Sequence, residues 1–263
     1  ELGIPELERS AALGEISERF PSVVAIAGCH GKTTITSMLA RINEAAHKDA
    51  TIHVGGFVDF LQGGVRVGHD GTFITEACEY VESFLTLAPT VALINNIDDD
   101  HLDYYKDIDH IVLAFRKFLD HLPENGLFIA CTDDPRVAAL AAESKHTVKS
   151  YGLHSGDYRA ENVRFDENGF PSFTITKNGD AVGDVSLTVP GLHNVLNALG
   201  AYVVAETFGI PFAAYAEAMY AFSNTKRRFE YYGERNGVRY FHDYGHHPNE
   251  IRATLDAASR VPH

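Results

Sequence analysis

The stretch Val23-Val24-Ala25-Ile26-Ala27-Gly28-Cys29-His30-Gly31-Lys32-Thr33-Thr34 decides which fold this sequence can adopt. Its first five residues are all apolar, and such a run predicts a strand buried on both faces of a parallel sheet. A glycine-rich turn ends the strand. Beyond the turn, apolar residues recur at helical spacing and predict a helix over residues 33–47. A strand, a glycine-rich turn and a helix in this order are typical of a phosphate-binding loop.

In a loop of this kind, backbone N–H groups and the positive end of the helix bind phosphate oxygens. We expect Lys32 to reach the outer phosphates and the Thr33 hydroxyl to bind Mg²⁺. The usual motif has a further glycine where Ile26 stands, so this loop is a shorter variant. The alternative is an ordinary strand–turn–helix junction. The residues predicted to bind phosphate are Gly28, Cys29, His30, Gly31, Lys32, Thr33 and Thr34.

Strands and helices alternate through the first 150 residues. Strands are predicted over residues 72–75, 90–95 and 127–131, and helices over 107–122 and 135–142. This alternation implies right-handed crossovers and a doubly wound, mostly parallel sheet of the α/β class.

After residue 151 the pattern changes to short β runs over residues 158–165, 170–176 and 184–189. Asn-Gly turns separate the runs and predict a small antiparallel β subdomain appended to the sheet. Two helices are predicted next, over residues 193–208 and 211–222. A strand over 237–241 and a helix over 248–258 then begin another β/α unit.

We interpret residues 1–22 as a linker, 23–224 as a central domain and 225–263 as the start of a second α/β domain. A unit of about forty residues rarely buries enough surface to be stable alone. We therefore expect the chain to be a fragment of a longer protein.

Composition excludes several classes of protein. The chain has 263 residues, of which 45% are hydrophobic and 22% charged, as in an ordinary globular protein. Its 22 Lys and Arg against 36 Asp and Glu give a net charge of −14, which disfavours nucleic acid and anionic membrane surfaces as partners. Three dispersed cysteines indicate free thiols, and no apolar run is long enough to insert into a membrane. We expect a cytoplasmic protein.

Further sequence blocks follow the loop in a fixed order, and together they resemble the Mur ligases, the ATP-dependent amide ligases of peptidoglycan assembly. The resemblance runs from about residue 23 to the C-terminus. The His-Gly-Lys-Thr-Thr form of the loop and the paired histidines are similar to the branch that adds L-alanine to UDP-N-acetylmuramate. The blocks are Thr75-Glu76-Ala77-Cys78-Glu79-Tyr80, Asn95-Asn96-Ile97-Asp98-Asp99-Asp100-His101, Pro190-Gly191-Leu192-His193-Asn194-Val195-Leu196-Asn197, Arg227-Arg228-Phe229-Glu230 and Asp243-Tyr244-Gly245-His246-His247-Pro248.

Two of these blocks supply candidate metal ligands. Glu76 ends a predicted strand and His101 follows another, and strand carboxyl ends face the ligand crevice of an α/β sheet. We therefore expect both beside Thr33, where they suit Mg²⁺ ions that bridge nucleotide phosphates. Lys32, Glu76 and His101 are the candidate catalytic residues. A solvated strand end is the alternative for Glu76, and a solvated acidic loop is the alternative for Asp100 and its acidic neighbours.

The resemblance implies roles for the remaining blocks. Asn194 and Asn197 would contact adenine and ribose, Asp243 would meet the ribose, and Arg228 would add charge at the phosphates. Tyr244, His246 and His247 would receive the incoming amino acid. From spacing alone, Asn194 could instead be a helix N-cap, and the His-His pair could instead cap the helix that follows.

Two positions depart from the usual family pattern. Other Mur ligases carry a carbamylated lysine where Arg116 stands, beside Lys117, and its absence again resembles the L-alanine-adding branch. Cys29 replaces the usual threonine. Because it lies at a helix N-terminus beside Lys32, we expect a lowered thiol pKa, the alternative being a passive small residue.

The resemblance implies transfer of the ATP γ-phosphate to the carboxylate of UDP-N-acetylmuramate, followed by attack of the L-alanine amine. Two other classes stay open: a P-loop switch or motor ATPase, and a nucleotide-binding module without turnover. For this chain alone we expect weak binding of ATP-Mg²⁺ and no ligation.

Overall fold

The computed structural model describes residues 6–261, so the first five residues of the predicted linker lie outside the described part. At the centre of a ten-stranded sheet, β1 (Ser22–Ala27) lies between β4 (Thr72–Glu76) and β5 (Val91–Ile94). Both neighbours run parallel to β1. The three strands therefore end at the same edge, and the loops that follow them meet there.

The sheet order is β10-β9-β8-β7-β6-β5-β1-β4-β2-β3. Neighbouring strands are parallel along the series β2, β4, β1, β5, β6, β7 and β8. They are antiparallel in the β8-β9-β10 meander and between β2 and β3. The further strands are β2 (Thr51–Val58), β3 (Gly63–Arg66), β6 (Leu127–Cys131), β7 (Thr147–Gly152), β8 (Tyr158–Phe165), β9 (Pro171–Lys177) and β10 (Asp180–Ser186).

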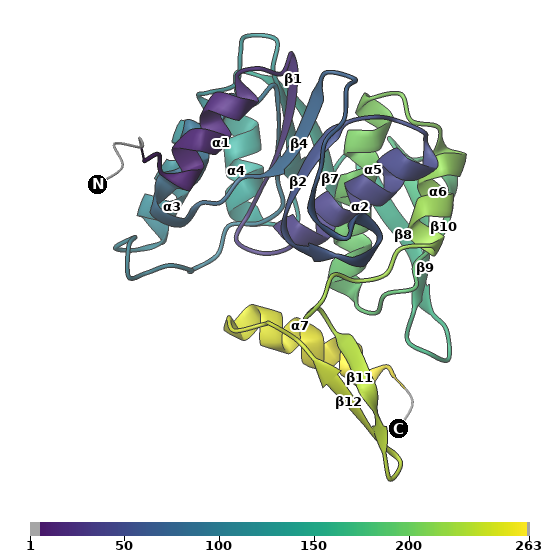
Figure 1. The fold of residues 1–263 in the computed structure, drawn as a ribbon. Coiled ribbons are helices and arrows are strands. Elements are labelled where there is room, and N and C mark those ends of the chain that lie inside the picture. Colours follow the sequence, from purple (N-terminus) through teal and green to yellow (C-terminus); the bar gives the residue numbers. More distant parts are fainter. Residues whose placement is uncertain (1–5, 262–263) are drawn as a thin grey trace.

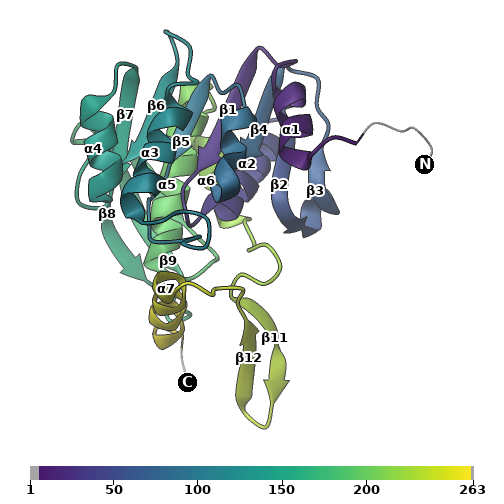
Figure 2. The same ribbon diagram turned by 90° about the vertical axis from the view of Figure 1, so that its left-hand side faces the viewer.

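Helices cover both faces of the sheet (Figures 1 and 2). On β1, Val24 and Ile26 join the buried cluster beneath one set of helices, while Ala25 and Ala27 join the cluster beneath the other. This double burial explains the unbroken apolar run, because residues alternate between the faces of a strand. One face carries α2 (Lys32–Ala45), α5 (Leu192–Thr207) and α6 (Phe212–Tyr220), and the other carries α1 (Arg9–Ser17), α3 (Ile108–Leu119) and α4 (Pro135–Glu143).

Short elements complete the main body. Two 3₁₀ segments, η1 (Asp59–Leu61) and η2 (Tyr80–Thr86), follow β2 and β4. Within residues 6–261, no helix combines the length and the apolar character needed to cross a bilayer.

The C-terminal unit is a two-stranded antiparallel hairpin and one helix, which extend away from the main body (Figure 1). It comprises β11 (Glu230–Arg235), β12 (Val238–His242) and α7 (Pro248–Ser259). The side chain of His247 caps α7 by accepting a hydrogen bond from the Asn249 backbone N–H. The N-terminus of α7 contacts the loops at the carboxyl edge of the main sheet.

The predicted fold class is confirmed: a doubly wound, mostly parallel sheet continues into an antiparallel meander. The predicted strand over 184–189 is placed too late, since β10 already begins at Asp180. Asn178 and Gly179 both adopt positive φ, and such a two-residue turn lets the next strand start at once. Strands β2, β3, β7 and β11 were not among the predicted strands.

Glu206 ties α5 to β7 and β9 of the sheet. Its carboxylate accepts a hydrogen bond from Lys149 Nζ at 2.7 Å and pairs with Lys177. Burial acts to raise the pKa of Glu206, but hydrogen bonds from the two lysines outweigh burial and lower its pKa to about 2. Because the folded-state pKa is depressed, the stabilisation is present above the unfolded pKa, near 4.5, and is lost as pH falls toward 2.

We therefore expect Glu206→Gln to reduce the free energy of unfolding at pH 7 and to cost progressively less as the pH falls from 4.5 to 2. Urea unfolding at a series of pH values measures this difference, with Glu161→Gln on β8 as a more exposed control. A cost that does not vary with pH would contradict the assigned ion pairs.

Candidate functional site

The turn after β1 is fixed by the residues that follow β5. Asn96 accepts hydrogen bonds from two backbone N–H groups of the turn: its carbonyl oxygen from Cys29 at 3.2 Å, and its side-chain oxygen from His30 at 2.8 Å. The neighbouring Asn95 donates from Nδ2 to the His30 carbonyl oxygen at 3.1 Å and to Asn197 Oδ1 at 3.2 Å. One loop thus holds the glycine-rich turn and links it to α5.

Gly31 is required by this close packing. It adopts φ 90°, and a Cβ atom there would lie 2.5 Å from Asn197 Oδ1 and 2.7 Å from Asn95 Nδ2. Gly31 also begins α2 without any side-chain cap. The first N–H groups of a helix have no partner within the helix, so this uncapped end offers donors and a positive dipole to an anion.

Lys32 makes a buried ion pair with Glu79, which lies in the Thr75–Tyr80 block and was not among the predicted site residues. The Lys32 ammonium donates to both Glu79 carboxylate oxygens, at 2.7 and 3.0 Å, and to the Gly28 carbonyl oxygen at 2.5 Å. Burial acts to lower the pKa of Lys32, and the adjacent carboxylate outweighs it, so the pKa is raised. For Glu79, burial acts to raise the pKa, and the Lys32 charge lowers it overall.

Glu76, the last residue of β4, lies next to Thr33 at the start of α2. Its carboxylate accepts from Thr33 Oγ1 at 3.0 Å and from the Gly55 backbone N–H at 2.5 Å. Burial raises the pKa of Glu76 despite these hydrogen bonds. Carboxylate and hydroxyl oxygens are the donors that Mg²⁺ prefers, and a cation would offset the cost of the buried charge. The residues present therefore fit a magnesium ion.

His101 belongs to a different group from the one predicted. Its Nε2 lies 3.6 Å from Glu79 Oε1, and its Nδ1 lies 3.8 Å from Asp100 Oδ1. The hydrogen bond to Glu79 raises the pKa of His101. Each of these three residues offers one ligand atom, and the atoms lie within 4.8 Å of one another. Of the predicted metal ligands, the structure joins Thr33 with Glu76, and it joins His101 with Asp100 and Glu79 instead.

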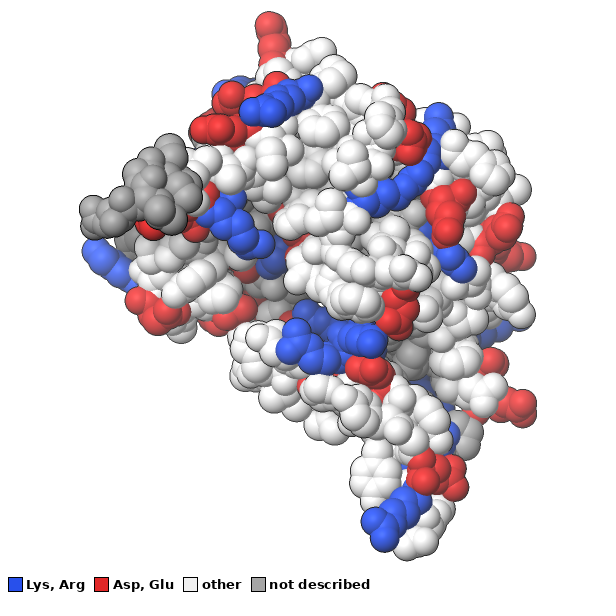
Figure 3. Space-filling model, viewed as in Figure 1, with Lys and Arg blue, Asp and Glu red and all other residues white. Residues whose placement is uncertain are grey.

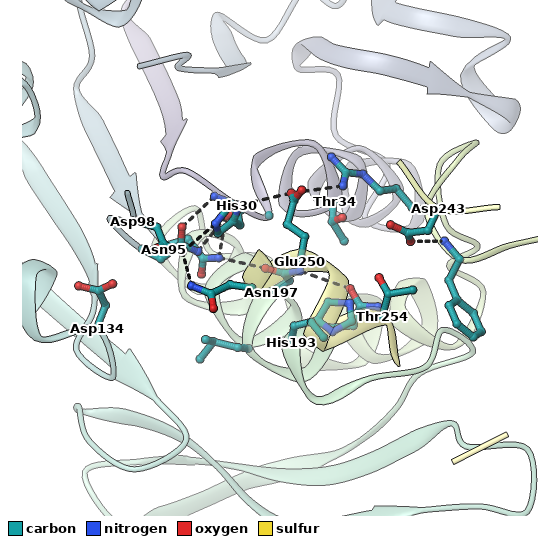
Figure 4. Close-up of a pocket in the computed structure, with 18 of the residues that line it drawn as sticks. His30, Thr34, Asn95, Asp98, Asp134, His193, Asn197, Asp243, Glu250 and Thr254 are labelled. Carbon is teal, nitrogen blue, oxygen red and sulfur yellow. Dashed lines mark hydrogen bonds and ion pairs between the residues drawn. The ribbon is translucent and has the colours of Figure 1, made fainter. Parts of the chain in front are cut away.

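A cavity of about 400 Å³ opens beside the loop (Figure 4). Its lining brings Gly31 and Thr34 of the loop together with four predicted site residues from distant blocks: Asn194, Asn197, Arg228 and Asp243. The same lining includes His193, whose pKa is lowered by burial, so that its imidazole is neutral.

The capping alternative for Asn194 is wrong. Gly191 is the N-cap of α5, and Asn194 lies inside the helix, where its Nδ2 donates to the Pro190 carbonyl oxygen at 2.8 Å. Asn197 donates in turn to Asn194 Oδ1 at 3.3 Å. Asn194 and Asn197 are both almost fully buried, and both line the cavity.

A second cavity, of about 430 Å³, lies between α2 and the C-terminal hairpin. Its lining includes Thr33, Gly55, Arg228 and Tyr244. Lys and Arg side chains gather at the junction between the main body and the C-terminal unit (Figure 3), where the Lys226-Arg227-Arg228 segment lines this cavity.

The two neighbouring histidines, His246 and His247, make different contacts. His246 is exposed and pairs with Glu250, 3.5 Å away. His247 is the N-cap of α7, as the capping alternative stated, and its Nε2 also lies 3.1 Å from the Asp99 carbonyl oxygen.

The prediction for Cys29 is wrong. The thiol is buried, 8% exposed, and burial raises its pKa far above the ordinary value, with the Glu79 charge acting in the same direction and outweighing Lys32. Its Sγ accepts from the Asp98 backbone N–H at 3.2 Å. The thiol is therefore protonated at neutral pH, and a packing role fits it better than reactivity.

Residues 26–205 match the family model described as the Mur ligase middle domain. The chain belongs to the Mur ligase family. The chain is 44% identical, over its whole length, to the UDP-N-acetylmuramate–L-alanine ligase of Alkaliphilus metalliredigens, and it covers 57% of that protein. It is 46% identical to the same-named ligase of Clostridium acetobutylicum, covering 98% of this chain and 56% of that protein.

Solved structures agree on the fold of this Mur ligase chain. The UDP-N-acetylmuramate–alanine ligase of Thermotoga maritima superposes with a TM-score of 0.83 at 28% identity, covering 96% of this chain and 57% of that one. A Mur ligase of the same organism, solved in complex with ADP, superposes with a TM-score of 0.78 at 18% identity over 96% of this chain and 61% of that one, and shows the fold alone. The chain thus spans a little over half the length of the curated relatives it matches.

Lys32 and Glu79 provide a test of the buried ion pair. We expect Lys32→Met to cost about 3–5 kcal/mol of unfolding free energy, because it leaves the Glu79 charge buried and unpaired. The double variant Lys32→Met with Glu79→Gln should cost less than the single one, since it removes both charges. Urea unfolding of both single variants and the double variant measures the coupling. Additive costs would contradict the pairing.

Proposed function

We propose that the protein containing this chain is an ATP-dependent ligase that joins L-alanine to UDP-N-acetylmuramate in the cytoplasm. The observation that carries the proposal is the cavity beside the loop, where Asn194, Asn197, Arg228 and Asp243 line the same space as Gly31 and Thr34. The names and identities of the curated relatives support the choice of substrates.

ATP would lie across the loop, with its adenosine in the 400 Å³ cavity. Asn194 and Asn197 offer amide donors and acceptors there, and Asp243 offers a carboxylate, which suits a ribose hydroxyl. The uncapped start of α2 would hold the phosphates of the nucleotide, and Arg228 would add a positive charge at the cavity rim.

Magnesium would be held by Thr33 and Glu76, and a second ion by Glu79, Asp100 and His101. Bound there, Mg²⁺ neutralises phosphate charge that an acidic protein would otherwise repel. In the described structure Lys32 is engaged by Glu79, so Lys32 would have to exchange that carboxylate for the outer phosphates of ATP.

The acceptor would occupy the second cavity, where Arg227, Arg228 and Tyr244 meet Thr33. A carboxylate oxygen of UDP-N-acetylmuramate attacks the γ-phosphorus, the bond to the β-bridging oxygen breaks, and ADP leaves. The L-alanine amine then attacks the acyl carbon, loses a proton and expels phosphate. Such transfers depend mainly on positioning and on charge stabilisation.

Arg228 tests the nucleotide site in this chain. We expect Arg228→Gln to weaken ATP-Mg²⁺ binding by about 1.5–3 kcal/mol, roughly 10- to 150-fold, because a charged hydrogen-bond donor is lost. Adenosine binding should stay unchanged, since Arg228 is assigned to the phosphates. Isothermal titration calorimetry measures both. Arg235→Gln, at the exposed end of β11, is the matched control. Equal loss for ATP and adenosine would contradict the assignment.

The reaction is tested by phosphate release from a version of the protein extended to the length of its curated relatives. We expect release to require both UDP-N-acetylmuramate and an amino acid, with L-alanine preferred over glycine and serine. Release without an amine acceptor would contradict ligation and favour a simple ATPase. Binding of ATP without turnover under all conditions would favour a nucleotide-binding module.

A further inference from the structure

A cluster of side chains joins the phosphate loop to α7. Asp98 Oδ2, in the loop after β5, lies 3.0 Å from His30 Nε2 and 3.5 Å from His247 Nδ1. The three ligand atoms lie within 4.8 Å of one another. Their side chains are only 14–20% exposed, and the two imidazole rings are 4.8 Å apart, centroid to centroid.

The spacing is close to that of a tetrahedral metal site. A zinc ion bonded at about 2.0–2.1 Å to nitrogen and carboxylate oxygen separates neighbouring ligand atoms by about 3.3 Å. The two short distances in the cluster lie on either side of that value.

The outer contacts orient both imidazoles toward the same point. His247 directs Nε2 to the Asp99 carbonyl oxygen at 3.1 Å, and His30 directs Nδ1 to Glu250 Oε1 at 3.3 Å. A metal ion between the three residues would leave the ring protons on these outer nitrogens. His30 Nε2 and His247 Nδ1 would then be its ligands, and His247 Nδ1 would give up the capping hydrogen bond that it accepts from the Asn249 N–H at 3.3 Å. Histidine ligands of metals typically donate their second N–H to a carbonyl or a carboxylate in this way.

We propose that His30, Asp98 and His247 form a binding site for one divalent transition-metal ion of the zinc class. Two imidazoles and one carboxylate select Zn²⁺, Co²⁺ or Ni²⁺ over Mg²⁺, which prefers oxygen ligands. His30 belongs to the phosphate loop and His247 to the N-terminus of α7, so the ion ties the C-terminal unit to the main body. The site borders the 400 Å³ cavity, since His30 and Asp98 line it.

Zinc titration of the 263-residue chain tests the site, with no nucleotide present, so its outcome is independent of the ligase proposal. A chromophoric chelator that competes for Zn²⁺ reports affinity and stoichiometry, and the visible absorption of bound Co²⁺ reports tetrahedral geometry. We expect one Zn²⁺ per chain at this site, retained in millimolar Mg²⁺.

Four variants separate this site from general histidine binding. His247→Asn keeps an N-cap side chain and loses the imidazole, and Asp98→Asn loses the carboxylate. Each should weaken Zn²⁺ binding more than about 100-fold, whereas Glu250→Gln, which removes an outer partner and keeps the capping box, should weaken it about 10- to 100-fold. His154→Asn, at an exposed surface histidine, should bind as the unaltered chain does.

Circular dichroism establishes that each variant is folded. Unchanged Zn²⁺ affinity in both His247→Asn and Asp98→Asn would overturn the proposal. So would an unaltered chain that fails to bind Zn²⁺ at micromolar concentration, or an equal loss of affinity in His154→Asn.

Discussion

The parallel pairing of β1 with both β4 and β5 determines which side chains meet at the phosphate loop. Ile26 on β1 is in register with Glu76 on β4 and with Leu93 on β5, so the three strands end together. Glu76 is thereby placed beside Thr33, and the loop after β5 is placed against the turn that follows β1. A shift of any of these strands by one residue would turn its buried side chains to the opposite face of the sheet.

Charge at this edge is balanced within the protein. The chain carries a net charge of −14. At this edge α2 begins without a side-chain cap, and Lys32 of the phosphate loop is paired with Glu79. Burial makes that pair strong and also makes it costly to leave one partner alone. An anionic ligand that draws Lys32 away must therefore be accompanied by positive charge for Glu79, and the second magnesium ion proposed at Glu79, Asp100 and His101 would supply it.

Sequence patterns predicted the elements whose signals are local. The apolar run of β1 and the helical spacing of α2 were read directly, and the motif identified the loop between them. Strand β2 was missed because Gly55 and Gly56 interrupt its pattern. The structure explains the first glycine: a Cβ atom on Gly55 would lie 2.8 Å from Glu76 Oε2. Glycine normally weakens a strand, but at position 55 it leaves the space that the Glu76 carboxylate occupies.

Residues whose role depends on distant partners could not be selected in the same way. Glu79 and Glu250 act through Lys32 and His30, which lie 47 and 220 positions away in the sequence. The only local signal for Glu250 was its spacing from His247, which is that of a capping box. The Cys29 prediction failed because the helix and lysine are visible in the sequence, while the burial that dominates the pKa of the thiol is not.

The central claim is that the loop and the cavity beside it form one nucleotide site, and a crystal structure of the chain with ADP and Mg²⁺ tests it most directly. The account predicts adenine beside Asn194 and Asn197, the phosphates over the start of α2, and a metal ion bonded to Thr33 or Glu76. A nucleotide bound away from residues 28–34, with the 400 Å³ cavity empty, would contradict it.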